Sequence, residues 1–237
     1  MNAKTIICLH GYGVRSFFWE PILPELRDMF PDVITPDLQM KTIDTLLATT
    51  CTAIQEKARL DGVPLVLLGH SLGGIVAALC AQELGPSIVG SVIIIASPYG
   101  TRETVPGPFA RFLLATGLIP DALVRPRFFS PATPVADQKY VFAQAVPESS
   151  AMRQTILQRK WFHTDAFGQP LRQPALVIAS TEDRIVPSAE SRQFAEVLGA
   201  TYTEFDARHN VGHDDFVWAP DIAAQVMQHI QSFLGVR

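Results

Sequence analysis

Short apolar runs that end in turns recur along this chain of 237 residues and alternate with helical patterns. The four clearest runs are residues 4–9, 64–68, 91–96 and 175–179. A continuous apolar run closed by turn residues is typical of a strand buried on both faces, as in a parallel sheet. Residues 32–35 and 201–205 are weaker candidates, and the second alternates in polarity like a strand near a sheet edge. We therefore expect a sheet of about six or seven strands.

The helical patterns lie between these runs, at residues 42–60, 72–84, 188–198 and 220–234. Strands that alternate with helices predict an α/β fold, with a mostly parallel sheet and helices on both faces. Its ligand site is expected beyond the carboxyl ends of the strands. Residues 99–172 break the alternation with several prolines and irregular helical patterns, so we interpret them as a helical lid inserted into a single domain. The core is expected to comprise residues 1–98 and 173–237.

Composition excludes several classes of protein. Hydrophobic residues make up 48% of the chain and charged residues 18%, which is too apolar for a disordered chain. The apolar runs are far shorter than the roughly 18 residues of a membrane span, so no such span is expected. The net charge of −4 argues against nucleic-acid binding across the whole surface, because that needs a basic face.

Location and redox state follow from the N-terminus and the cysteines. The first apolar run begins directly after Lys4, which leaves no room for a secretory signal peptide. Cys8, Cys51 and Cys80 lack the spacing of metal ligands, and Cys8 and Cys80 lie in apolar segments that favour buried thiols. We expect a cytoplasmic protein.

The segment Gly69-His70-Ser71-Leu72-Gly73-Gly74 places a serine between an apolar strand and an alanine-rich helix. A nucleophilic serine on such a strained turn needs small neighbours two residues before and after it, and Gly69 and Gly73 supply them. The turn would lift the hydroxyl above the sheet. The backbone N–H of Leu72, at the start of the helix, can point at a developing oxyanion.

With this turn the chain resembles the α/β-hydrolase superfamily, and more narrowly its lid-bearing serine esterases and lipases. The resemblance spans nearly the whole chain and implies the α/β-hydrolase fold. In that family an H-G-x-G turn after an early strand supplies a second oxyanion N–H, and residues 10–13, His-Gly-Tyr-Gly, match it. The resemblance thus implies that Tyr12 donates through its backbone, and His10 is expected to be structural.

The resemblance also implies the partners of Ser71, which needs a base to remove its proton. In the family the base follows the last strand, where His209 and His213 are the candidates. His213 is preferred because it stands in a Gly-His pair before an apolar stretch and a proline. The acid is expected after the penultimate strand, where Asp183 is preferred to Glu182 because it precedes an Ile-Val-Pro helix entry. Other histidines, including His70, are expected to be structural.

These residues predict a serine hydrolase that cleaves carboxylic esters, or thioesters, through an acyl-enzyme. No metal and no cofactor are implied. Carbon–carbon bond hydrolysis and perhydrolysis use the same triad and stay open, because one fold hosts many chemistries. A binding protein of the same fold that has lost turnover is the alternative from another class.

Substrate choice is expected to depend on the lid and on the residues after the oxyanion turn. Phe18, Trp19, Phe142 and Trp161 are candidates for lining the acyl pocket, although aromatic residues more often simply pack. The lid is also the basic part of the chain, with Arg125, Arg127, Arg153, Arg159 and Lys160. Such charges could steer a small acidic acyl-carrier protein to the site, and esterases that act on carrier-bound methyl esters are similar in size and lid position.

Overall fold

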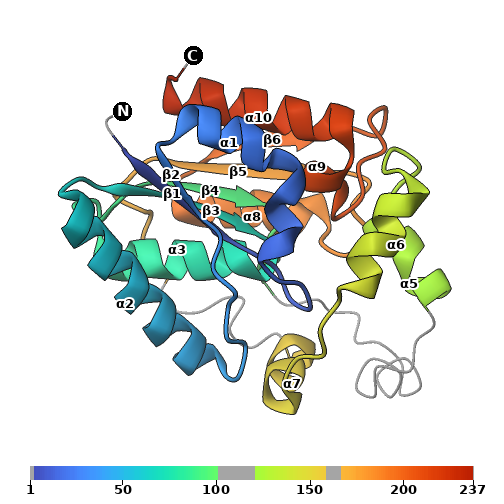
Figure 1. Cartoon of the computed structure of the whole chain (residues 1–237), viewed down its shortest axis with the longest axis horizontal. Helices are drawn as coiled ribbons and strands as arrows, with labels where there is room; N and C mark the ends of the chain where they lie inside the picture. The colour runs from blue at the N-terminus through green and yellow to red at the C-terminus, as the bar shows by residue number, and fades with distance from the viewer. Residues whose placement is uncertain (1–2, 101–120, 159–166, 237) are drawn as a thin grey trace.

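Six parallel strands form the centre of the protein (Figure 1). The computed structural model describes residues 3–100, 121–158 and 167–236. The strands are β1 (Thr5–Leu9), β2 (Asp32–Ile34), β3 (Leu65–His70), β4 (Val89–Ile95), β5 (Ala175–Ser180) and β6 (Thr201–Phe205). They are ordered β2-β1-β3-β4-β5-β6, and each neighbouring pair is parallel. The prediction of a mostly parallel sheet is confirmed.

Helices cover both faces of this sheet. One face carries α2 (Ile43–Asp61), α3 (Leu72–Leu84) and α8 (Ser188–Leu198), and the other carries α1 (Leu23–Met29) and α10 (Pro220–Leu234) (Figure 1). The four long helices begin and end within one residue of their predicted bounds. The sequence did not indicate the 3-10 helix η1 (Ser16–Ile22), α1 or α9 (Asp215–Trp218), because a segment of four to seven residues is too short for a helical period to show.

The core consists of two apolar clusters separated by the sheet. Neighbouring residues of β1 alternate between them, so that Ile7 and Leu9 face α2 and α3 while Ile6 and Cys8 face α1 and α10. This two-sided burial explains why the strand is apolar throughout. Cys51 and Cys80 are also buried, with their sulfur atoms 2.9 Å apart between α2 and α3.

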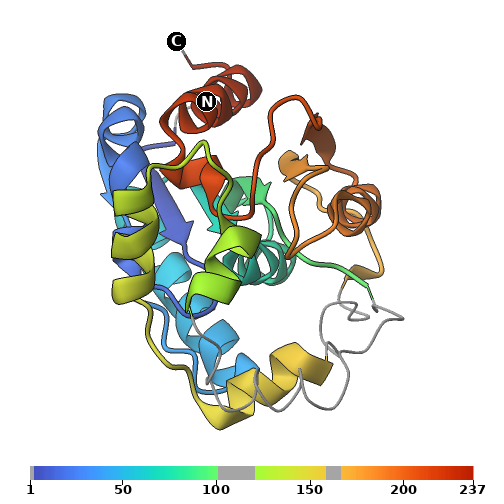
Figure 2. The same cartoon turned by 90° about the vertical axis from the view of Figure 1, so that its right-hand side faces the viewer.

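The insertion between β4 and β5 is helical in its described part. It contains α5 (Asp121–Phe128), α6 (Val135–Ala143) and α7 (Ser150–Gln158). α5 and α6 lie beyond the carboxyl ends of the strands, where the sequence placed the ligand site, whereas α7 lies lower, on the side of α2 (Figure 1 and Figure 2). None of the described helices is long and apolar enough to cross a membrane.

Candidate active site

Ser71 occupies a strained turn between β3 and α3. Its backbone has φ 51° and ψ −122°, a conformation that residues with a side chain rarely adopt. A Cβ at Gly69 would lie 2.4 Å from the carbonyl oxygen of Gly73, and one at Gly73 would lie 2.0 Å from that of Leu9. Both contacts are shorter than any real Cβ contact. Glycine is therefore required at both positions by backbone sterics.

A third glycine and a neighbouring serine complete this turn. A Cβ at Gly74 would lie 1.9 Å from Oγ of Ser97, which itself donates a 2.7 Å hydrogen bond to the carbonyl of Ser71. The amide of Ser71 donates to the carbonyl of Ile95 at the end of β4 (2.8 Å). Ser71 is thus fixed through its backbone by β4 and the turn that follows it, and the residue is half-buried at the sheet edge.

The turn after β1 lies against Ser71. A Cβ at Gly11 would be 3.1 Å from Cβ of Ser71, so a side chain there would push the two turns apart by a few tenths of an ångström. Among the described residues, no acceptor is found for the backbone N–H of Tyr12 or of Leu72. The geometry is compatible with the predicted pair of oxyanion donors.

His10 shapes this turn from within. Its Nδ1 donates to the carbonyl of Gly11 (2.8 Å), and its Nε2 accepts from the amide of Leu38 (2.9 Å). Burial lowers the pKa of His10 to about 4, so the ring is neutral at physiological pH. Both ring nitrogens serve the backbone, as expected for a structural histidine.

The insertion also contacts this turn. The amide of Val146 donates to the carbonyl of Gly13 (2.9 Å), and Arg15 forms an ion pair with the buried carboxylate of Glu148 (2.5 Å). The segment between α6 and α7 therefore holds the candidate oxyanion turn from the lid side.

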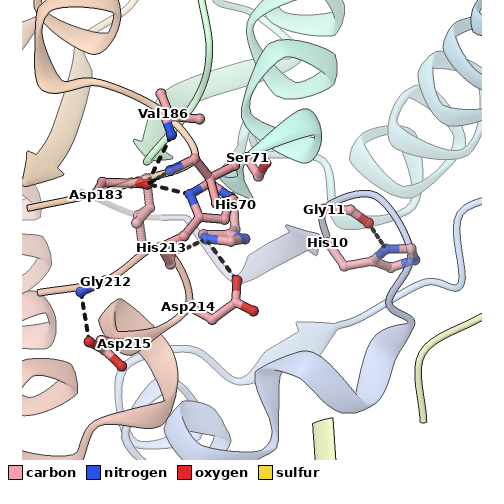
Figure 3. Close-up of polar contacts among 12 residues, drawn as sticks. His10, Gly11, His70, Ser71, Asp183, Val186, Gly212, His213, Asp214 and Asp215 are labelled. Atoms are coloured by element: carbon pink, nitrogen blue, oxygen red, sulfur yellow. Dashed lines mark hydrogen bonds and ion pairs between the residues drawn. The ribbon is translucent and has the colours of Figure 1, made fainter. Parts of the chain in front are cut away.

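Asp183 is buried in the turn after β5, and its two carboxylate oxygens have separate partners. Oδ1 accepts from the amides of Ile185 (2.8 Å) and Val186 (2.9 Å). Oδ2 accepts from Nδ1 of His213 (2.8 Å) (Figure 3). The Ile-Val-Pro helix entry thus positions the carboxylate that reaches His213. By contrast, Glu182 has no hydrogen bond to this histidine.

His213 is 2% exposed and stands in the loop between β6 and α9. Because a carboxylate only accepts, the contact with Asp183 places the proton of the neutral ring on Nδ1 and leaves Nε2 as the basic nitrogen. His209, the competing candidate, lies on the surface, where its Nδ1 pairs with Asp206 (3.0 Å). The structure brings His213, and not His209, to Asp183.

His70 supports His213, a role that the sequence did not indicate. Its Nε2 donates to the backbone carbonyl of His213 (2.8 Å), and its ring stacks on Phe18 with centroids 4.6 Å apart. Burial, and secondarily the charge of His213, hold the pKa of His70 well below its usual range. A neutral His70 therefore fixes the loop that carries His213 from the strand side.

Three of the four candidates for lining the acyl pocket lie in the described residues. Phe18 and Trp19 are fully buried in η1, where Phe18 stacks on His70 and contacts Trp19 edge to face. Their contact with the substrate stays a prediction. Phe142 on α6 is half-buried and contacts Phe128 edge to face (centroids 5.9 Å). Trp161 lies outside the described residues.

Two buried carboxyl groups follow His213, and the sequence analysis did not single them out. The pKa of Asp214 is raised to about 7, chiefly by burial; the charge of His213 lowers it and those of Asp183 and Asp215 raise it. Asp215 is fully buried and accepts hydrogen bonds from three other residues. The pair Asp214-Asp215 is visible in the sequence, but their distant partners are not.

One group of described residues could contribute metal ligands. Side-chain atoms of His70, His213 and Asp214 lie within 4.8 Å of one another. Nε2 of His70 is engaged by a carbonyl and Nδ1 of His213 by Asp183, so two of the four imidazole nitrogens are already in use. The hydrogen bonds account for this clustering, and the absence of a metal from the reaction stays a prediction.

Ser71, His70, His213 and Asp183 are thus gathered at one end of the sheet, from β3, β5 and the loop after β6 (Figure 3). The arrangement offers a strained serine and a histidine whose Nδ1 is held by a buried carboxylate. Two backbone amides lie on the turns around the serine. Together they have the composition of a charge-stabilised nucleophilic site.

A family comparison covers almost the whole chain. The sequence profile of the "Alpha/beta hydrolase family" matches residues 6–226. Among characterised proteins, the pyrrolizixenacetamide deacetylase of Xenorhabdus hominickii is 24% identical over 230 residues, which cover 86% of this chain and 83% of that protein. The biotin biosynthesis bifunctional protein BioHC of Cellvibrio japonicus is 28% identical over 105 residues, 41% of this chain and only 20% of that protein.

Solved structures agree on the fold. A thermophilic esterase from Thermogutta terrifontis superposes with a TM-score of 0.70 at 20% identity, covering 98% of this chain and 89% of the other. The 2-hydroxy-6-oxo-6-phenylhexa-2,4-dienoate hydrolase of Rhodococcus sp. strain RHA1 superposes with a TM-score of 0.78 at 20% identity, covering 99% and 91%.

Proposed function

Because the chain belongs to the alpha/beta hydrolase family, we propose that it is a serine hydrolase that cleaves carboxylic esters. Ser71 is the nucleophile, His213 the general base and Asp183 the residue that orients the base. The observation that carries the proposal is the 2.8 Å hydrogen bond between Nδ1 of His213 and Oδ2 of Asp183, both buried at the edge of the sheet where Ser71 stands.

The reaction begins when Nε2 of His213 takes the proton of Ser71 as Oγ attacks the ester carbonyl. Asp183 stabilises the imidazolium that forms, without itself taking the proton. His213 then donates the proton to the leaving alcohol, which gives an acyl-enzyme on Ser71. Water, deprotonated by His213, attacks this acyl group and releases the carboxylic acid.

The oxyanion of each tetrahedral intermediate is bound by the backbone N–H groups of Tyr12 and Leu72. The close approach of Gly11 to Ser71 supports this assignment, because it brings the first turn beside the nucleophile. Backbone donors held by two separate turns need no rearrangement as the negative charge develops.

Esters are proposed as substrates on the basis of the esterase among the structural neighbours and the resemblance stated above. Thioesters are attacked through the same steps. Carbon–carbon bond cleavage and perhydrolysis stay alternatives with the same triad, and the dienoate hydrolase among the neighbours has the same fold. Delivery of the acyl group by an acidic carrier protein remains a proposal that rests on Arg125, Arg127 and Arg153 of the described lid.

The test is the hydrolysis of p-nitrophenyl esters, from acetyl to dodecanoyl, by the wild-type protein and by Ser71→Ala. We expect measurable turnover with a clear chain-length optimum, and a loss of roughly 10³-fold or more in kcat for Ser71→Ala. Ser87→Ala, in the exposed turn between α3 and β4, is the matched control and is expected to retain full activity. Equal turnover by Ser71→Ala and wild type would refute the proposal. No turnover of any ester by folded wild-type protein would favour the binding protein.

A further inference from the structure

We propose that Asp215 is a positioning residue. Its side chain connects residues 128–133 of the lid, which we call the lid segment, to the loop that carries His213. This inference rests on the proposed function, because it concerns the placement of the base. Neither the predicted triad nor the oxyanion turns include Asp215. Its carboxylate is nevertheless fully buried and bridges two segments about 80 residues apart in the sequence.

The carboxylate of Asp215 accepts from donors on both segments. From the lid, the amide of Ser130 donates to Oδ2 (3.0 Å) and the hydroxyl of Thr133 donates to Oδ1 (2.6 Å). From the loop that carries His213, the amide of the preceding residue, Gly212, donates to Oδ2 (2.7 Å). Figure 3 shows this last contact beside His213. Each oxygen therefore has at least one short hydrogen bond to the lid segment.

A second set of contacts joins the same two segments. The amide of Asp214 donates to the carbonyl of Phe128 (2.9 Å), and the ring of Phe128 meets that of His213 edge to face, with centroids 5.7 Å apart. A Cβ at Gly212 would lie 2.8 Å from the same carbonyl. The lid segment thus packs directly on the backbone before and after His213.

The bridge depends on a charged group. Within the described ranges no lysine, arginine or histidine forms an ion pair with Asp215, and its carboxylate is held there by hydrogen-bond donors. Hydrogen bonds to an ionised acceptor are stronger than those between neutral groups. Removing the acceptor would leave the buried amides of Ser130 and Gly212 without partners, which is costly. The donors would then move apart.

The consequence concerns catalysis more than folding. His213 is held by Asp183 through its ring and by His70 through its carbonyl, and Asp215 adds the third attachment, through Gly212. Because the same carboxylate holds the lid, the base reaches its place only when the lid segment is docked. A displacement of about 1 Å at such a group can lower the rate by roughly 10²-fold.

The experiment compares Asp215→Asn with Thr133→Val, which removes only the lid hydroxyl. Asp221→Asn, at the exposed start of α10, is the matched control for replacing a carboxylate by an amide. Activity is measured per active site titrated with a fluorophosphonate, well below the unfolding temperature, so that unfolded protein does not contribute. We expect kcat to fall about 10–100-fold in Asp215→Asn and several-fold in Thr133→Val, with KM changed less, and no change in Asp221→Asn.

Hydrogen–deuterium exchange distinguishes a positioning role from a general contribution to stability. In Asp215→Asn, exchange should increase together in peptides covering residues 128–133 and 209–214, while peptides from β3 and α3 stay protected. Wild-type kcat per titrated site in both variants would overturn the proposal, as would faster exchange spread evenly over the chain. Should Asp215→Asn fail to fold, Thr133→Val decides by the same two measurements. If wild type itself is not labelled, the proposed function fails instead.

Discussion

The turn of Ser71 and the loop of His213 are both immobilised, but by different forces. The serine turn is fixed by contacts within residues 69–74 and with the adjacent strands, where a Cβ at Gly69 or Gly73 would overlap backbone atoms. The histidine loop is held by buried polar groups from β3, from the turn after β5 and, through Asp215, by the insertion. Steric exclusion fixes the turn of Ser71, whereas hydrogen bonds from three separate segments fix the loop of His213.

This difference determines how each region responds to change. Backbone overlap cannot be relieved without moving a strand, so the serine turn either forms completely or does not form. Hydrogen bonds from three separate segments can be lost one at a time, so the position of the base can be adjusted in steps. We expect replacement of the glycines in the first region to abolish folding, and loss of the hydrogen bonds in the second to reduce turnover in the folded protein.

The largest effect is expected for Gly73→Ala. The new Cβ would lie 2.0 Å from the carbonyl oxygen of Leu9 in β1, which is backbone and cannot yield without disrupting the sheet. We expect little folded protein, measured as soluble yield and by circular dichroism. Gly62→Ala is the matched control, since its Cβ would meet nothing within 4 Å and its positive φ should cost only about 1 kcal/mol. Equal stability of the two variants would contradict the steric account.

A smaller effect, confined to activity, is expected for Asp183→Asn. The amide would leave His213 without a carboxylate to fix its tautomer and stabilise its charge, so kcat should fall by roughly 10²–10⁴-fold. The fold should persist, because an asparagine oxygen can still accept from the amides of Ile185 and Val186. Steady-state kinetics and thermal unfolding separate the two quantities. A variant with near wild-type kcat would show that Asp183 does not orient the base.

The smallest effect is expected for Asp214→Asn and concerns stability. The pKa of Asp214 is about 7 in the folded protein, against 3.8 for a free side chain, so the folded state binds the proton more tightly. Its contribution to stability is therefore fully present below about pH 4 and is lost as the pH rises toward 7. Asn does not titrate, so this loss is absent from Asp214→Asn. The free energy of unfolding of the variant, relative to that of wild type, should therefore rise by roughly 2 kcal/mol between pH 5 and pH 8.

Thermal unfolding at pH 5 and pH 8 measures this gain, expressed as the variant's Tm minus that of wild type. Because the pKa values of His10 and His70 are lowered by burial, these residues reduce the stability of the folded protein as the pH falls through about 6.5. Both are present in wild type and variant, so their effect cancels in the Tm difference. A Tm difference that is the same at both pH values would show that Asp214 titrates like an exposed carboxyl.

Much of the fold and of the candidate site could be predicted because the signals are local. The buried strands are continuous apolar runs, and the glycines around Ser71 are required by contacts within six residues and with β1. His213 and Asp183 were identified through short patterns around each residue. In this sense the residues of the triad could be found without knowing where they lie relative to one another.

The supports of the base could not be predicted, because they depend on residues far apart in the sequence. His70 reaches the carbonyl of His213 across 143 residues, and Asp215 reaches Ser130 across 85. Nothing in the local pattern of Asp214 and Asp215 distinguishes two buried carboxyls from a solvated acidic pair. The complete burial of Phe18 and Trp19 was not predicted for the same reason, since it depends on tertiary packing.

The central claim, that Ser71 is activated by His213, is tested most directly by reacting the protein with a fluorophosphonate and mapping the adduct by peptide mass spectrometry. The account predicts one adduct, on Ser71, that is absent in Ser71→Ala and forms at least 100-fold more slowly, in order of magnitude, in His213→Ala. His209→Ala should label at the wild-type rate. An adduct on another serine, or equal labelling rates in wild type and His213→Ala, would contradict the claim.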